Sequence, residues 1–225
     1  NIPGAGWGQF AASIAVVTGA GSGMGRELAV QLAGAGAHLA LSDIHLDTLT
    51  ETVGLARAAA PGDITITAHV CDVSDENAVV AWRDAVMADH QTSHVNYVFN
   101  NAGIGGGGSF VTDERDAWER TFNICWFGVY YSSRAFMPLL VAAEHGHLVN
   151  TSSVNGFWAS IGPGRPHSAY SAAKFAVKGF TEALITDLRA NAPHVKASVV
   201  MPGHIGTSIA LNSVRVHGGE VDAGV

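Results

Sequence analysis

The sequence has little of several features that mark other classes of protein. Its 225 residues include only two cysteines and 12 basic residues, against 19 acidic ones, and the formal net charge is -7. Because Cys71 and Cys125 lack C-x-x-C spacing, they predict buried thiols in a reducing compartment rather than a disulfide framework or a metal site. The acidic balance and the lack of a basic run argue against a nucleic-acid partner.

Long apolar runs and several catalytic motifs are also missing. No uninterrupted apolar stretch approaches the ~18 residues needed to span a bilayer, and residues 1–10 do not have the pattern of a signal peptide. We therefore expect no membrane partner and a cytoplasmic location. The absence of a G-x-S-x-G elbow excludes the usual α/β-hydrolase site. No H-E-x-x-H spacing accompanies the 11 histidines, so we expect no metal site.

What the sequence does contain is an alternation of short β-rich runs with longer helical stretches. The predicted strands are 14–18, 38–42, 64–70, 97–100, 147–151 and 196–201, and the predicted helices are 23–33, 46–60, 76–90, 114–144 and 169–191. This order predicts a single α/β domain over residues 1–225, a Rossmann-type doubly wound parallel sheet flanked by helices. Such sheets bind ligands at the carboxyl ends of their strands.

A glycine-rich turn follows the first predicted strand and leads into the first predicted helix. It satisfies neither the strict G-x-G-x-x-G fingerprint nor a P-loop, but Gly19, Gly23 and Gly25 form the pattern G-x-x-x-G-x-G. Glycines at a helix N-terminus let backbone N–H groups face a pyrophosphate without interference from Cβ atoms. We predict a dinucleotide site here that includes Ser22 and Met24; the alternative is a plain strand-to-helix turn.

An acidic residue at the end of the second predicted strand indicates which dinucleotide binds. Asp43 lies 20 residues after Gly23, where a carboxylate reaches the adenosine ribose hydroxyls. It would repel a 2′-phosphate about 4 Å away by roughly 1 to 4 kcal/mol per unit charge. Neither Ser22 nor Ser42 is basic, and we interpret Arg26 as a solvated helix residue rather than a phosphate clamp. The sequence therefore predicts NAD over NADP.

The ends of the third and fourth predicted strands offer further contacts. Asp72, followed by Val73, either hydrogen-bonds the adenine amino group or serves as a turn or N-cap residue, and the sequence leaves both open. The fourth strand ends in Asn-Asn-Ala-Gly, residues 100–103, whose small and amide side chains allow the backbone to approach a bound ribose.

The most direct indication of chemistry is the spacing of Tyr170 and Lys174. Residues four apart lie on one face of a helix, where an ammonium favours the ionised form of a phenol and makes it an acid/base group. By itself, the same spacing is also typical of an ordinary amphipathic helix.

Taken together, these motifs resemble the short-chain dehydrogenase/reductase family. The matching residues extend from about residue 14 to 207 and are, in order, Gly19-x-x-x-Gly23-x-Gly25, Asn100-Asn101-Ala102-Gly103, Asn123, Ser152-Ser153, Tyr170-x-x-x-Lys174 and Pro202-Gly203. The resemblance implies an NAD-dependent oxidoreductase that interconverts a secondary alcohol and a ketone by hydride transfer. It also implies a homo-oligomer, a tetramer or a dimer.

The resemblance also implies individual roles. Tyr170 would act as general acid/base, with Lys174 supporting it and binding the nicotinamide ribose. Ser153 would hold the substrate oxygen, with Ser152 as the alternative, and Asn123 would anchor a proton-relaying water. The implied cofactor-binding set is Gly19, Ser22, Gly23, Met24, Gly25, Asp43, Ile44, Asp72, Val73, Asn101, Ala102, Gly103, Tyr170, Lys174, Pro202, Gly203, Ile205 and Thr207.

Two segments differ from the family pattern and bear on the substrate. The 17-residue separation of Ser153 and Tyr170 is longer than usual, and residues 208–225 do not resemble the family's substrate-covering helix and last strand, which we expect to be short or absent. The predicted substrate-binding residues are Ser153, Asn155, Phe157, Tyr170 and His204. Two other functions stay open: an NAD(H) sensor without turnover, and a dehydratase or epimerase that uses the same cofactor.

Overall fold

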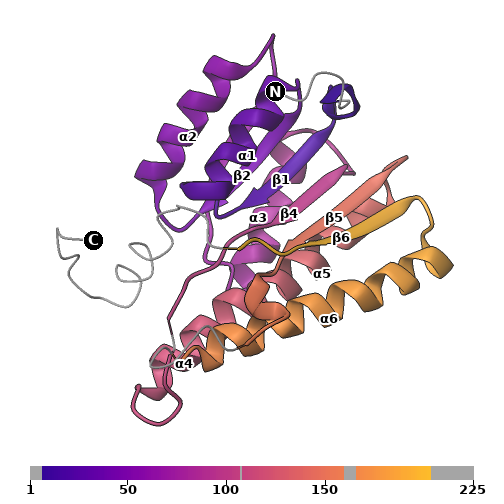
Figure 1. Ribbon diagram of the computed structural model, residues 1–225. Helices are drawn as coiled ribbons and strands as arrows, with labels where there is room; N and C mark the ends of the chain where they lie inside the picture. The colour runs from indigo at the N-terminus through magenta and orange to yellow at the C-terminus, as the bar shows by residue number, and fades with distance from the viewer. Residues whose placement is uncertain (1–6, 107, 160–165, 204–225) are drawn as a thin grey trace.

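One parallel sheet organises the chain. The computed structural model describes residues 7–106, 108–159 and 166–203. Its strands are β1 (Ile14–Thr18), β2 (His38–Asp43), β3 (Ile66–Val70), β4 (Tyr97–Asn100), β5 (Gly146–Thr151) and β6 (Val195–Val200). They pair in parallel in the order β3-β2-β1-β4-β5-β6, and the order reverses between β1 and β4 (Figure 1). The predicted doubly wound sheet is confirmed, and its switch point lies where α/β sheets bind ligands.

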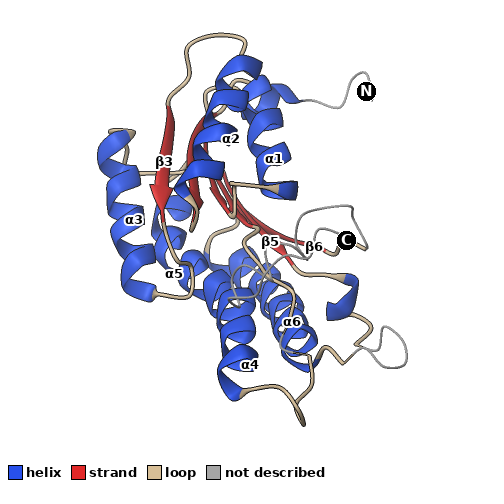
Figure 2. Cartoon of the chain, turned by 90° about the vertical axis from the view of Figure 1, so that its left-hand side faces the viewer, coloured by secondary structure: helices blue, strands red, loops and turns tan. Residues whose placement is uncertain are grey.

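Helices cover both faces of this sheet. The helical elements are η1 (Trp7–Phe10), α1 (Gly23–Gly34), α2 (Leu46–Ala59), α3 (Glu76–Asp89), α4 (Arg115–Phe122), η2 (Asn123–Phe127), α5 (Gly128–Val141), η3 (Val154–Gly156) and α6 (Ser168–Asn191). The α1 and α2 helices form one apolar core against the sheet, and α3, α5 and the end of α6 form the other (Figure 2). No helix in these described ranges is long and apolar enough to cross a membrane.

The continuous helix predicted over 114–144 is wrong in two respects. A π-helical segment interrupts it at 123–127, where the Gly128 N–H donates to the Asn123 carbonyl five residues earlier, and α5 ends at Val141. The interruption coincides with close packing, because a Cβ on Gly128 would lie 2.7 Å from Cγ2 of Val73, a residue in the loop after β3. Gly128 and Val73 are distant in the sequence, so the helical periodicity of residues 114–144 does not reveal their contact or the π-helical segment beside it.

Both cysteines are buried and free, as predicted. Burial and the neighbouring Asp72 and Asp75 carboxylates raise the pKa of the Cys71 thiol to about 12. The Cys125 thiol lies in the π-helical segment and donates to the Ile104 carbonyl. Neither thiol is exposed for reaction.

A buried polar network ties the carboxyl ends of β4 and β5 to the helices beneath them. Asn100 Nδ2 donates to Asn150 Oδ1 at 2.8 Å and to Ser133 Oγ at 2.9 Å, and Asn150 Nδ2 donates to Thr181 Oγ1 at 2.9 Å. All four side chains are at most 2% exposed. The network therefore holds the carboxyl ends of both strands in position relative to α5 and α6. Within it, the Asn100 side chain faces the helices rather than the glycine-rich turn.

Replacing Asn150 with alanine should destabilise the fold, because it removes one acceptor of the Asn100 amide and the donor to Thr181, and opens a small cavity. Lost hydrogen bonds in a buried network cost about 2–3 kcal/mol, which corresponds to a fall in Tm of roughly 4–12 °C for a chain of this size. Differential scanning fluorimetry measures the shift. Asn191→Ala is the matched control, because Asn191 is exposed and bonds only within the last turn of α6. Equal shifts in the two variants would contradict a structural role for the network.

Histidines gather at the outer edge of the sheet. Thr67 Oγ1, on β3, lies 3.0 Å from His69 Nε2 and 3.1 Å from His90 Nε2, and His69 Nε2 lies 3.6 Å from Asp89 Oδ2. Burial lowers the pKa of His69 against the opposing effect of Asp89. Burial also lowers the pKa of His90, assisted by the nearby His38. On β5, burial and Lys196 lower the pKa of His147.

These lowered pKa values predict sensitivity to mild acid. The unfolded chain takes up protons on these histidines as the pH falls through about 6.5, whereas the folded chain resists protonation, so stability is lost as the pH falls. We expect Tm to decline between about pH 7 and pH 5.5, above the range where ordinary carboxylates titrate. Thermal unfolding across this range measures the decline. His69→Asn should flatten it, whereas the exposed control His45→Gln should not; a Tm independent of pH here would contradict the prediction.

Candidate active site

The glycine-rich turn after β1 is packed so tightly that it has no room for side chains. Gly19 adopts φ +65° and its Cβ would lie 2.8 Å from the Ala102 Cα. A Cβ on Gly25 would collide with the Gly19 carbonyl oxygen and lie 2.6 Å from Asn101 Nδ2. The turn is therefore held as a bare backbone surface at the N-terminus of α1, where a phosphate group can approach.

The end of β4 is pinned to this turn by polar contacts. The Thr18 hydroxyl, at the end of β1, accepts from the backbone N–H groups of Asn101 and Ala102, each at 3.0 Å. The Asn101 amide donates to the Thr18 and Gly19 carbonyls at 3.2 and 3.3 Å. Two of the strand ends predicted to contact a dinucleotide thus form one rigid edge. Ser22, Gly23 and Met24 continue it into α1.

Asp43 ends β2 beside the same turn. Its Oδ2 accepts from the Gly21 N–H at 2.9 Å and its Oδ1 accepts from the His45 N–H at 3.1 Å. The carboxylate is therefore oriented by two backbone donors and lies next to the glycine-rich backbone, as a ribose-binding group requires. Ile44, the next residue, is 40% exposed.

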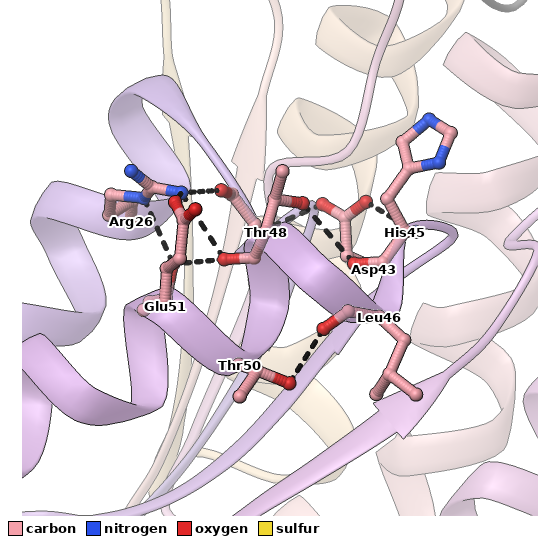
Figure 3. A network of polar contacts seen from close by, with 9 residues as sticks. Arg26, Asp43, His45, Leu46, Thr48, Thr50 and Glu51 are labelled. Atoms are coloured by element: carbon pink, nitrogen blue, oxygen red, sulfur yellow. Dashed lines mark hydrogen bonds and ion pairs between the residues drawn. The ribbon is translucent and has the colours of Figure 1, made fainter.

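The interpretation of Arg26 as a solvated helix residue is wrong. Its guanidinium crosses from α1 to α2, where Nη2 donates to Glu51 Oε2 at 2.9 Å and Nε donates to Thr52 Oγ1 at 3.0 Å (Figure 3). Nη2 also donates to the Gly21 carbonyl at 2.6 Å and to the Thr48 carbonyl at 3.2 Å. The side chain is only 29% exposed. The arginine is thus held by the protein through Nε and Nη2.

Asp72 and Val73 follow β3. Asp72 Oδ1 accepts from the Ser74 backbone N–H at 2.9 Å and from the Ser74 hydroxyl at 2.6 Å, so this aspartate forms a turn. Asp75, rather than Asp72, caps α3. Val73 is buried against Gly128. Of the roles left open for Asp72, the turn is present, and a contact with adenine stays a prediction.

Tyr170 and Lys174 lie one turn apart near the N-terminus of α6. Lys174 Nζ lies 5.5 Å from the centre of the Tyr170 ring, and it donates to the Thr151 carbonyl at 2.8 Å. The lysine is 2% exposed, and Tyr170 is half-buried. In the part of the chain that the structure describes, the Tyr170 hydroxyl has no hydrogen-bond partner. An ammonium buried beside an available phenol is the arrangement that acid/base chemistry needs.

The two serines after β5 have different environments. The Ser152 hydroxyl donates to the Lys174 carbonyl at 2.8 Å and serves to join β5 to α6. Ser153 instead is the N-cap of η3, where its hydroxyl accepts from the Asn155 N–H at 3.1 Å and donates to Asn155 Oδ1 at 3.4 Å. Asn155 is 8% exposed, and its Nδ2 lacks a hydrogen-bond partner among the described residues. Ser153 and Asn155 are therefore the polar groups of this turn that are suited to meet a ligand.

Asn123 begins the π-helical segment and is half-buried. The next residues, Ile124 and Cys125, pack in a small core cluster to which Tyr170 also contributes. A Cβ on Gly103 would lie 3.5 Å from Lys174 Nζ and 3.8 Å from Cys125 Sγ. The stretch after β4, the π-helical segment and the lysine are thus neighbours, although they are far apart in the sequence.

The last predicted site residues lie partly beyond the described ranges. Pro202 is held by its carbonyl, which accepts from the Val154 N–H at 3.0 Å, and Gly203 follows it. Phe157 is 70% exposed beside η3. Predicted contacts at His204, Ile205 and Thr207 lie outside the described residues, as do residues 160–165 of the long segment before Tyr170.

The sequence pattern did not predict the contacts of three residues at this site, Thr18, Gly21 and Arg26. Thr18 joins β1 to β4, Gly21 contacts Asp43, and Arg26 joins the glycine-rich turn to α2. Gly21, an additional glycine inside the G-x-x-x-G-x-G pattern, was the one indication of these contacts in the sequence, because such a position often marks a close approach to the backbone.

Comparisons with known proteins place this geometry in context. A profile described as short chain dehydrogenase matches residues 13–215. SadH of Mycobacterium tuberculosis, named as an oxidoreductase, is 43% identical over 210 residues, which cover 93% of this chain and 73% of SadH. A Burkholderia phymatum short-chain dehydrogenase/reductase in complex with NAD has a TM-score of 0.83 and 35% identity, over 92% of this chain and 70% of that one. A metagenomic short-chain oxidoreductase in complex with NADP has a TM-score of 0.75 and 30% identity, over 87% of this chain and 85% of that one.

Proposed function

This chain belongs to the short-chain dehydrogenase/reductase family of oxidoreductases, and we propose that it interconverts a secondary alcohol and a ketone with NAD. The observation that carries the proposal is the buried Lys174 ammonium, which lies beside the Tyr170 ring and donates to the Thr151 carbonyl at the carboxyl end of β5, the same edge of the sheet as the glycine-rich turn. Hydride transfer needs an oriented cofactor together with one proton donor or acceptor at the substrate oxygen, and these groups supply both.

The residues present fit a dinucleotide. Cβ atoms on Gly19 or Gly25 would fill the space against the turn, so a backbone surface is kept for the pyrophosphate. When bound, NAD supplies the nicotinamide carbon that accepts or returns the hydride. The chain would hold it with Gly19, Ser22, Gly23, Met24, Gly25, Asp43, Ile44, Asp72, Val73, Asn101, Ala102, Gly103, Tyr170, Lys174, Pro202, Gly203, Ile205 and Thr207.

We assign NAD rather than NADP from the charges at the ribose end of this cradle. Asp43 presents a carboxylate there, and the nearby Arg26 guanidinium already pairs with Glu51. A 2′-phosphate would meet an anion with no available cation among the described residues, which costs roughly 1 to 4 kcal/mol per unit charge at about 4 Å. The relative crystallised with NAD agrees with this assignment, and the one crystallised with NADP shows that the family uses either.

The positions of the side chains suggest a route for the proton of the substrate hydroxyl. In oxidation, Tyr170 takes the hydroxyl proton of the substrate; in reduction, it returns that proton to the carbonyl oxygen. Ser153 holds the same oxygen through its hydroxyl. Lys174 stabilises the charge on Tyr170, and Asn123 anchors a water through which the proton reaches solvent. Asn155, Phe157 and His204 complete the proposed substrate contacts.

A panel of secondary alcohols and ketones tests the function. Absorbance of the reduced nicotinamide should change with at least one substrate of the panel, in proportion to enzyme concentration. Dinucleotide binding without turnover would favour an NAD(H) sensor, and product formation without net change in absorbance would favour a dehydratase or epimerase. Either result would overturn the proposal.

We also propose that residues 1–225 act as one cofactor-binding domain that assembles with copies of itself. The described strands all belong to one sheet, which supports a single domain. Partly exposed aromatic rings of Trp126, Phe127, Tyr130 and Phe180 lie together on η2, α5 and α6, where a second copy could cover them. Light scattering of the purified protein distinguishes a dimer or tetramer from a monomer, and a monomer would contradict assembly.

A further inference from the structure

The backbone of Gly21 lies between two charged side chains. Its N–H donates to Asp43 Oδ2 at 2.9 Å, and its carbonyl accepts from Arg26 Nη2 at 2.6 Å. Both bonds are charge-assisted, and they hold the two peptide groups that flank the Gly21 Cα. The position of the N–H that orients the Asp43 carboxylate therefore depends on the guanidinium that holds the adjacent carbonyl.

The backbone of Gly21 is closely packed by its neighbours. A Cβ on Gly21 would lie 2.6 Å from Thr48 Oγ1 and 2.8 Å from Asp43 Cγ. Thr48, at the start of α2, also gives its carbonyl to Arg26 Nη2 at 3.2 Å. The glycine-rich turn, the end of β2 and the first turns of α2 thus meet at one point, and Arg26 contacts two of the three (Figure 3).

Glu51 holds the outer side of the guanidinium. Its Oε2 lies 2.9 Å from Arg26 Nη2, and its side chain is 65% exposed, against 29% for the arginine. An exposed pair of this kind adds little to stability. Its effect here is on position, because it keeps the guanidinium on α2.

We propose that Arg26, held by Glu51, is a positioning residue that determines cofactor specificity. It orients Asp43 toward the two ribose hydroxyls by holding the Gly21 backbone in place, and Glu51 keeps it from pairing with a 2′-phosphate. The inference rests on the proposed function, because it concerns how the same site discriminates between NAD and NADP.

Direct titration of NAD+ and NADP+ onto purified variants, followed by intrinsic fluorescence, tests the two halves separately. Arg26→Gln should raise the Kd for NAD+ about tenfold, the scale of one charge-assisted hydrogen bond, while the rate at saturating NAD+ falls much less. Arg26→Lys should recover part of the affinity, because an ammonium can still donate to the Gly21 carbonyl. Glu51→Gln should lower the Kd for NADP+ about fivefold by removing the carboxylate that neutralises the guanidinium, with NAD+ affinity changed less than about twofold.

The double variant Arg26→Gln/Glu51→Gln should lose the NADP+ gain, since no guanidinium is left to attract the 2′-phosphate. Arg57→Gln, which removes an exposed arginine from the last turn of α2, is the matched control and should leave both Kd values unchanged. A NADP+ gain that persists in the double variant would overturn the proposal, as would an Arg26→Gln protein with unchanged preference. Wild-type protein that binds neither dinucleotide would instead overturn the proposed function, and the inference with it.

Discussion

Tyr170→Phe is expected to lose about 100-fold or more of turnover while it keeps its affinity for NAD+. The substitution removes one oxygen and no bond within the described protein, and the ring can keep its place above Lys174 and against the small core cluster. Most of the proposed cofactor contacts lie on other elements, so the Kd for NAD+ should change less than about threefold. Initial rates with the best substrate of the alcohol and ketone panel, together with NAD+ titration, separate the two effects.

Tyr131→Phe supplies the matched control for this loss. Tyr131 lies on α5 and packs against the main core, away from the proposed site, so its hydroxyl should not affect turnover. If Tyr170→Phe turned over at the wild-type rate, the acid/base role would be wrong. If both tyrosine variants lost turnover equally, the effect would belong to packing rather than to proton transfer.

Gly25→Ala is expected to damage the cofactor site through a single methyl group. Its Cβ would collide with the Gly19 carbonyl and lie 2.6 Å from Asn101 Nδ2, so either the turn or the end of β4 must move. Overpacking of this kind costs about 1–3 kcal/mol, and if that cost falls on the bound conformation, the Kd for NAD+ rises roughly tenfold to 100-fold. NAD+ titration measures this directly.

Gly54→Ala makes the same chemical change on an open surface. Gly54 lies on α2 and a Cβ there would meet nothing within 4 Å, so the substitution should leave NAD+ affinity unchanged. Alanine in a helix interior is also favoured over glycine by about 0.5–1 kcal/mol, and the Tm should rise slightly. Wild-type affinity in Gly25→Ala would show that the turn does not approach the dinucleotide as proposed.

The architecture was predictable because its signals are local. Buried parallel strands appear as short apolar runs, and their carboxyl ends are marked by Gly19, Asp43 and Asn101 within a few residues of each strand. The pair Tyr170 and Lys174 was equally visible, because helical spacing alone puts both on one face.

What the sequence did not reveal depends on contacts between distant segments. Arg26 appears as an ordinary helix residue until α2 is placed beside it, and only then does Glu51 become its partner. Asn100 and Asn101 are adjacent amides, but the pleat directs the first toward α5 and the second toward the glycine-rich turn. The choice between Ser152 and Ser153 likewise required the Lys174 carbonyl to be in place.

Two hydrogen bonds between Lys174 and the carboxyl end of β5 have a consequence for how this enzyme can diversify. Lys174 donates to the Thr151 carbonyl and accepts, through its own carbonyl, from Ser152. The proposed acid/base pair is therefore anchored to the sheet, whereas two of the proposed substrate contacts, Asn155 and Phe157, lie after Ser153, in a segment that carries neither bond. Exchange of that segment between relatives should thus alter which molecule is accepted while the chemistry is inherited intact, a modular arrangement suited to engineering new selectivity.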